Sequence, residues 1–161
     1  MTTKDVIVSV KGIQKDFVEN DSVEVITTGQ LYKKNSKYYI NYVDSDLFIK
    51  SETKTTIKIA KDKIDIIRFG GSNTHMIFET NKKHMTHYDT PFGALLIGVI
   101  TKNISFKEKD NSLELKVNYQ LEINNGFVGE NSFEVKVQEK SSNIHLMDRH
   151  FNHQISREEQ L

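Results

Sequence analysis

The residue whose neighbours most suggest binding chemistry is Arg68. A strand over residues 63–69 would place Arg68 on the same face as Ile64 and Ile66. If that face is interior, the guanidinium needs an anionic partner, which a carboxylate or phosphate ligand could supply through two parallel hydrogen bonds. Two alternatives stay open: the opposite face, with Ile67, points inward, or Arg68 lies at a rim and pairs with an acidic side chain.

Four tyrosines on predicted strands form a second candidate group. Each of them, Tyr38, Tyr42, Tyr88 and Tyr119, could offer an apolar ring and a polar hydroxyl to a ligand. Aromatic residues also fill sheets where no ligand binds, so ordinary packing is the alternative. The sequence predicts no catalytic residue, and the candidate ligand-binding residues are Arg68, Tyr42, Tyr88 and Tyr119.

Metal and cofactor binding are not expected. The chain has no cysteine, which excludes thiolate ligands and disulfides, and six histidines. His84 and His87 would point to opposite faces of a strand, and His150 and His153 share a face only if the C-terminal segment is helical. Two ligands do not make a stable metal site.

The motifs of common enzyme classes are absent from the sequence. There is no Walker loop, no Gly-x-Ser-x-Gly elbow and no dinucleotide-binding glycine pattern. The glycine-rich residues 70–72 lie between two predicted strands and indicate a turn. Barrel-type triphosphatases carry the motif Glu-x-Glu-x-Lys along an inward-facing strand. Residues 134–136 lack the first glutamate of this motif, which argues against a triphosphatase. We therefore expect a protein that is not an enzyme.

The charges are balanced and interspersed. Lysine plus arginine and aspartate plus glutamate number 22 each, which argues against a nucleic-acid partner. Lysines nevertheless gather near predicted turns, at residues 33–34, 61–63, 82–83 and 107–109. If these turns share one end of the fold, that end could meet an anionic surface; the alternative is that they are solvated lysines that protect strand edges.

The elements that must position these residues are strands. Residues 112–124 alternate apolar and polar side chains with a period of two, as in a long strand with one buried face. Similar segments recur along the chain with short polar breaks, and the only proline is Pro91. We expect about 8–10 strands, near residues 6–11, 23–32, 37–44, 53–60, 63–69, 74–80, 83–89, 94–107, 112–124 and 126–140.

These strands predict an all-β fold. Short connections imply antiparallel neighbours, and long strands that curl and close would give a single up-and-down barrel. A two-sheet sandwich is the alternative. Residues 1–140 are expected to form the barrel domain. Residues 141–161 are expected to form a tail, either a short amphipathic helix, because Ile144, Met147, Phe151 and Ile155 recur at helical spacing, or a disordered segment.

Three motifs carry a resemblance to a known family. They are residues 55–59 with 65–70, then residues 76–78, and then residues 88–93. In this order and spacing the chain resembles the YwiB-like family of small bacterial proteins, a family built on a domain of unknown function, over about residues 4–140. The resemblance implies a lipocalin-like, calycin-type barrel and no established activity.

The function predicted from these observations is non-catalytic binding of a small, partly apolar or anionic ligand, such as a lipid-like molecule, inside a cytoplasmic barrel. The alternative is a protein-interaction module with a filled core, and a homodimer is compatible with it. The sequence shows no signal peptide and no apolar run long enough for a membrane helix, so no membrane contact is expected.

Overall fold

The computed structural model describes residues 2–15, 20–46, 51–71 and 73–140, and almost all of these lie in strands. Ten strands follow one another along the chain: β1 (Lys4–Lys15), β2 (Asn20–Lys34), β3 (Lys37–Asp46), β4 (Ser51–Ala60), β5 (Lys63–Gly70), β6 (Thr74–Glu79), β7 (Lys83–Thr90), β8 (Gly93–Lys109), β9 (Ser112–Ile123) and β10 (Gly126–Glu139). The predicted tail, residues 141–161, lies outside the described residues.

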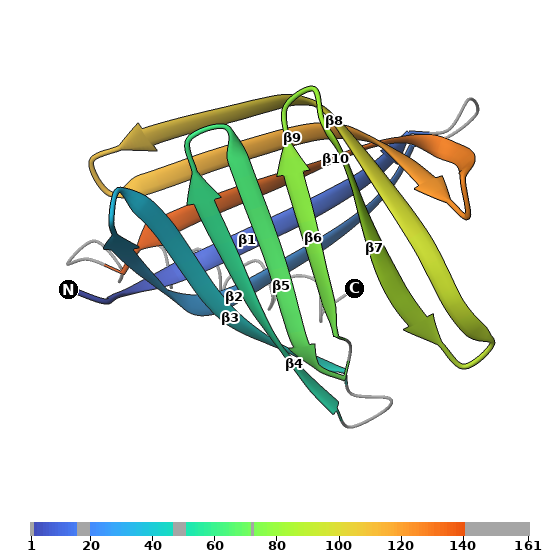
Figure 1. Ribbon diagram of the computed structural model, residues 1–161. Coiled ribbons are helices and arrows are strands. Elements are labelled where there is room, and N and C mark those ends of the chain that lie inside the picture. The colour runs from blue at the N-terminus through green and yellow to red at the C-terminus, as the bar shows by residue number, and fades with distance from the viewer. Residues whose placement is uncertain (1, 16–19, 47–50, 72, 141–161) are drawn as a thin grey trace.

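All ten strands belong to one antiparallel sheet that curls into a nearly closed barrel (Figure 1). Strands that follow one another in sequence pair in the sheet, except β6 and β7, which form its two ends. In addition, the first strand, β1, pairs with the last strand, β10. The expectation of an all-β antiparallel barrel is confirmed.

The two ends of the barrel differ. The β2–β3 ladder covers only the residues beside its turn, from Gly29 paired with Tyr42 to Lys34 paired with Lys37. Beyond Gly29 the two strands part, and β6 and β7 also diverge away from their shared turn (Figure 1). We call the end toward which both pairs separate the open end; it carries the β1–β2, β3–β4, β5–β6, β7–β8 and β9–β10 connections. The other end, the closed end, carries the remaining turns.

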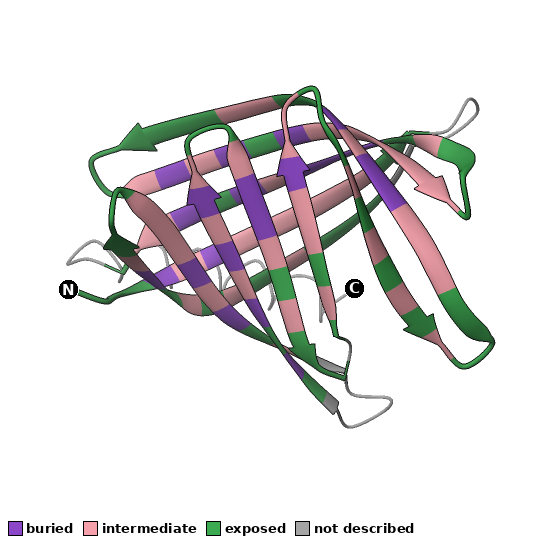
Figure 2. Ribbon diagram, viewed as in Figure 1, coloured by how far each residue is buried: buried purple, intermediate pink, exposed green. Residues whose placement is uncertain are grey.

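The strand residues alternate between an interior and an exterior face. On β9, Leu113, Leu115 and Val117 are at most 5% exposed, whereas Lys116 between them is exposed, which confirms the pattern predicted for this strand. Toward the open end of the same strand, Tyr119 and Leu121 are only partly buried. Figure 2 shows this gradient from buried to intermediate along the long strands. The packed core therefore lies mainly in the closed half of the barrel, and the interior-facing residues of β9 become more exposed toward the open end.

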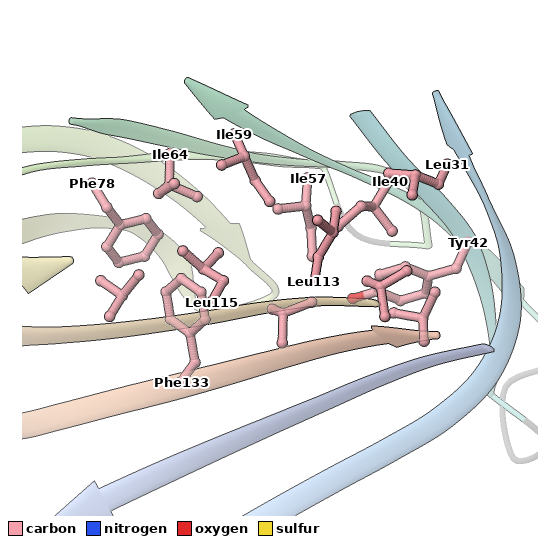
Figure 3. Close-up of a cluster of buried hydrophobic side chains, with 14 of the residues drawn as sticks. Leu31, Ile40, Tyr42, Ile57, Ile59, Ile64, Phe78, Leu113, Leu115 and Phe133 are labelled. Atoms are coloured by element: carbon pink, nitrogen blue, oxygen red, sulfur yellow. The ribbon is translucent and has the colours of Figure 1, made fainter. Parts of the chain in front are cut away.

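The core joins opposite walls of the barrel (Figure 3). Phe78 of β6 is almost fully buried, and its ring meets Tyr119 and Phe133 edge-on at centroid distances of 5.0 and 4.9 Å. Ile57 and Ile64 pack into the same cluster from β4 and β5. These contacts cross the interior, so they hold the short strand β6 onto the wall made by β9 and β10.

The turns use residues that tolerate a left-handed backbone. Asn35, Asp62, Asn81 and Asn124 all have positive φ, between 50° and 66°. Asn and Asp adopt this conformation more readily than other non-glycine residues, because their short polar side chains bond locally. The turns predicted at these positions are confirmed.

Polar side chains interact with one another at the closed end of the barrel. The Tyr38 hydroxyl donates a hydrogen bond to Glu108, and Lys4 forms an ion pair with Glu139 at 2.6 Å. Desolvation and the Glu108 carboxylate raise the pKa of Tyr38 to about 12. The four lysine-bearing turns lie at this end, as the up-and-down topology requires. That these lysines contact an anionic surface stays a prediction.

No helix among the described residues is long and apolar enough to cross a membrane.

Candidate functional site

A cavity of about 750 Å³ opens where β2 and β3 part. Most of its lining residues, such as Thr28 and Asn41, belong to the exterior face of the sheet, and a few, such as Tyr42 and Thr55, belong to the interior face. A hydrogen bond of 2.7 Å from Thr56 to Asn41 braces the exterior side. The volume lies within the usual range of small-molecule sites. The side chains around the cavity offer hydroxyl and amide groups, together with the charged groups of Asp5, Lys54 and Lys140.

Gly29 allows β2 and β3 to approach closely at the last pair of their ladder, directly before they part. A Cβ on Gly29 would lie 2.6 Å from the Asn41 carbonyl oxygen and 2.9 Å from Val8 Cγ2. Both distances are too short for a real side chain, so only glycine allows this close approach of β2 to β3. The cavity begins directly beyond this contact.

Arg68 faces the interior of the barrel on the wall beside this cavity. Its register partner on β4 is Thr55, which in turn pairs with Tyr42 on β3. Arg68 Nη2 donates to Asp44 Oδ2 at 3.3 Å, while Arg68 Nε is buried with no hydrogen-bond partner among the described residues. Both sequence interpretations of Arg68 therefore hold in part, since the residue points inward and is paired with an acid.

Tyr42 lies two residues before Asp44 on β3, on the same face of the sheet as this ion pair. The residue is 8% exposed, and burial together with the neighbouring Asp44 carboxylate raises the pKa of its hydroxyl. The hydroxyl therefore stays protonated at neutral pH and can donate a hydrogen bond. Of the four candidate residues, the structure brings Arg68 and Tyr42 together.

A second polar group lies on the opposite wall, across β8, β9 and β10. Thr101 and Asn131 both pair in register with Tyr119, so their three side chains lie side by side on the interior face. Thr101 is fully buried and Asn131 is 9% exposed. Thr101 Oγ1 and Asn131 Nδ2 have no hydrogen-bond partner among the described residues. Each such group costs about 1–3 kcal/mol when it is left unpaired.

Sequence reasoning found Tyr119 but missed Thr101 and Asn131. Thr101 follows Val99 at strand spacing, yet a β-bulge at Lys102 shifts the register of β8 immediately after it. The β6–β7 turn also bonds to Thr101, through Asn81 N to Thr101 O at 3.0 Å and Thr101 N to Lys82 O at 3.3 Å. The only signal in the sequence was that strand alternation places Thr101 on the same face as the apolar residues of β8.

The remaining candidates lie apart. Tyr88 faces the interior on β7, where its register partner is Leu95, and it is partly buried. Tyr38 belongs to the closed end. His84 and His75 each bond to a single carboxylate, Glu79 at 3.0 Å and Asp65 at 2.8 Å. Within the described residues no group of three or more metal-ligating side chains comes together.

Comparison with known proteins agrees with the resemblance seen in the sequence. Residues 8–135 match the family model described as "Domain of unknown function (DUF1934)". The "Uncharacterized beta-barrel protein YwiB" of Bacillus subtilis (strain 168) is 25% identical over 115 residues, which are 71% of this chain and 79% of that protein. The crystal structure of the ywiB protein from Bacillus subtilis superimposes with a TM-score of 0.74 at 20% identity, covering 86% of this chain and 94% of that one.

The fold similarity extends over nearly the whole of the solved barrel, and the family model spans most of the strands described above. The chain therefore belongs to the family defined by the domain of unknown function DUF1934.

Proposed function

We propose that the protein binds, without transforming it, a small and partly apolar molecule in the open half of its barrel. The observation that carries the proposal is the cavity of about 750 Å³ between β2 and β3, with Tyr42 in its wall. A calycin-type barrel, which the family resemblance implies, would hold such a ligand in this way. The chain contains no cysteine, and we place the binding in the cytoplasm.

The interior provides both kinds of surface that such a ligand needs. Ile66, Met76, Ile97 and Leu121 are partly buried apolar residues that pack against the edge of the core. Polar groups lie among them on both walls. An anionic ligand group could meet Arg68, although it would then compete with Asp44 for the guanidinium.

Filling the cavity should abolish binding. Thr28 is exposed and lines the cavity, so Thr28→Trp places an indole in the ligand's space with little effect on the core. We expect a lipid and metabolite library to contain compounds that raise the melting temperature of the wild-type protein but not that of the variant. Met85→Trp, at an exposed position on β7 outside the cavity, is the matched control and should keep the shift.

Arg68→Leu tests separately whether Arg68 binds an anionic ligand group. If this variant binds fatty acids or anionic dyes as well as the wild-type protein does, Arg68 has no role in ligand binding. A clean ligand-free mass in native mass spectrometry, together with no thermal shift across the library, would contradict the proposed function.

Exposed apolar side chains at the open end favour a second candidate, contact with a partner protein or a second copy. Phe69, Phe92 and Phe127 are 70%, 100% and 62% exposed, and they lie beside the β5–β6, β7–β8 and β9–β10 turns. An exposed apolar patch marks an interaction site when its side chains lie together, and these three side chains lie at the same end of the barrel.

Phe92→Ser should therefore reduce self-association in sedimentation velocity while leaving the melting temperature unchanged. Met85→Ser, at an exposed position away from these turns, is the control. A wild-type protein that sediments as a monomer at high concentration, with no partner recovered from cells, rules this candidate out.

A further inference from the structure

We infer that the C-terminal segment, residues 141–161, covers the exterior face of β1–β5 across the gap between β2 and β3. This contact goes beyond the proposed function and does not depend on it. Its first support is the position of Lys140, the last described residue. Lys140 lines the cavity between β2 and β3, and its backbone N–H donates a hydrogen bond to Asp5 O on β1 at 2.9 Å. The chain therefore leaves the barrel beside this cavity.

The exterior face of β1–β5 carries apolar side chains on both sides of the gap. Ile7 and Ile26 lie on the β1–β2 side, and Val43, Ile67 and Phe69 lie on the β3–β5 side. Four of these five residues are exposed, and Ile7 is partly buried. We call the five residues the outer patch. They flank the cavity, so a segment that lies along the cavity would contact both groups.

The exterior face of the opposite wall differs. The exterior positions of β9 from Glu114 to Glu122 and of β10 from Glu134 to Gln138 are all polar or charged. Two of them, Lys116 and Glu134, form an ion pair at 3.7 Å. A sheet face that stays in water alternates to polar side chains, as this wall does, whereas a gathered set of exposed apolar residues marks an interaction surface. The contrast indicates that the outer patch has an occupant.

The gap also leaves two strand edges facing each other. Beyond the pair of Gly29 with Tyr42, the ladders of the described residues give β2 a partner only in β1 and β3 a partner only in β4. Exposed strand edges invite pairing with other chains, and proteins often cover them with a helix or a loop. Both edges lie within the outer patch, so one segment laid across the gap would protect them together.

The sequence of the C-terminal segment suits this role. Its apolar residues recur at spacings of three and four, which a helix would gather on one side: Ile144, Met147, Phe151 and Ile155. A helix over residues 144–155 would be about 18 Å long. The four strand spacings from β1 to β5 measure about 19 Å. The lengths match for a helix that crosses these strands.

The tether at Lys140 favours the chain's own segment over a second copy. Lys140 is bonded to β1, at the edge of the outer patch, and residues 141–143 can span about 10 Å. A segment held by such a short linker is present at an effective concentration of the order of millimolar. A separate chain would have to reach a similar concentration to compete.

A spin label on the full chain tests the contact. The chain has no cysteine, so His153→Cys provides a single labelling position, and a helix would turn it away from the apolar side. In NMR spectra of the labelled, nitrogen-15 protein we expect the amide signals of Ile26, Val43 and Lys54 to lose most of their intensity. The amide signals of Lys116 and Lys136, on the opposite wall, should keep theirs.

Two further substitutions in the labelled chain test whether the apolar surfaces make the contact. Val43→Asp places a charge in the outer patch, and Phe151→Ser removes an apolar side chain from the segment without changing any residue of the barrel. Each should restore the signals of Ile26 and Lys54. Val128→Asp is the matched control, because Val128 is 45% exposed against 43% for Val43 and lies at the open end of β10. It should leave the loss of signal unchanged.

Three results would overturn the inference. The first is a labelled chain whose β1–β5 signals keep their intensity. The second is a loss of signal that neither Val43→Asp nor Phe151→Ser relieves. The third is the same loss in a mixture of unlabelled nitrogen-15 chains with spin-labelled nitrogen-14 chains, which would assign the outer patch to a second copy. None of these measurements uses a ligand, so the inference and the proposed function can fail separately.

Discussion

Replacing Phe78 by alanine should destabilise the protein by about 3–5 kcal/mol, the usual cost of emptying a fully buried aromatic site. Phe78 is 1% exposed and contacts the rings of Tyr119 and Phe133. The loss should be near the upper limit, because β6 is an end strand of the sheet and has a ladder only with β5. Phe78 is the side chain that ties this strand to the opposite wall.

Urea unfolding followed by far-UV circular dichroism measures this loss, since the chain has no tryptophan for fluorescence. Phe92→Ala is the matched control, because Phe92 is fully exposed and its removal should change the free energy of unfolding by less than about 0.5 kcal/mol. A loss below about 1 kcal/mol for Phe78→Ala would show that the contacts of Phe78 with Tyr119 and Phe133 do not hold β6 to the opposite wall.

Gly70→Ala is the second substitution with a large expected effect, a loss of about 3 kcal/mol. Gly70 has a φ of 126°, which side chains rarely adopt, and a Cβ there would lie 2.2 Å from the backbone oxygen of Glu52. That oxygen also accepts the hydrogen bond from Gly71 N at 3.1 Å. The substitution must therefore both strain the backbone and displace the end of β4.

Two other glycines separate these contributions. Gly93 has a similar φ of 121° with open space around its Cβ position, so Gly93→Ala should cost only the backbone strain. Gly12 has neither a positive φ nor a close neighbour, and Gly12→Ala should be neutral or slightly stabilising. Chemical denaturation of the three variants should rank them Gly70, Gly93, Gly12. An equal loss at Gly70 and Gly93 would show that the contact with Glu52 relaxes at no cost.

The side-chain alternation predicted much of this fold because one face of each long strand is buried. On β1, Val6 and Val8 are fully buried as expected, and the turn at Asn35 lies where the polar break predicts it. The parting of β2 from β3 was not predictable. The ladder ends at Gly29, and a glycine inside a strand can equally indicate a bulge or a bend.

The candidate site was predictable only residue by residue. Parity allowed Arg68 to point inward, and the structure shows that it does, but its partner Asp44 comes from β3 and depends on the combined register of β3, β4 and β5. Thr101 has the same limitation, since its neighbours across the sheet are set by a bulge. Alternation reveals which face a side chain occupies, whereas its partners follow from pairings between distant segments.

The order of strands also bears on how the chain folds. Reading around the barrel from β7 to β10 and on from β1 to β6, every neighbour is joined by a short turn except the first and last strands, where Val6 lies beside Glu139. Every one of the ten strands therefore has a sequence neighbour as a hairpin partner on at least one side, and only the β1–β10 pairing requires the two ends of the sheet-forming chain to meet. It carries the largest loop-closure entropy in the molecule. Because rates fall as contacts become more distant in sequence, the meeting of β1 and β10 is the slow, topology-limited step expected in forming the barrel.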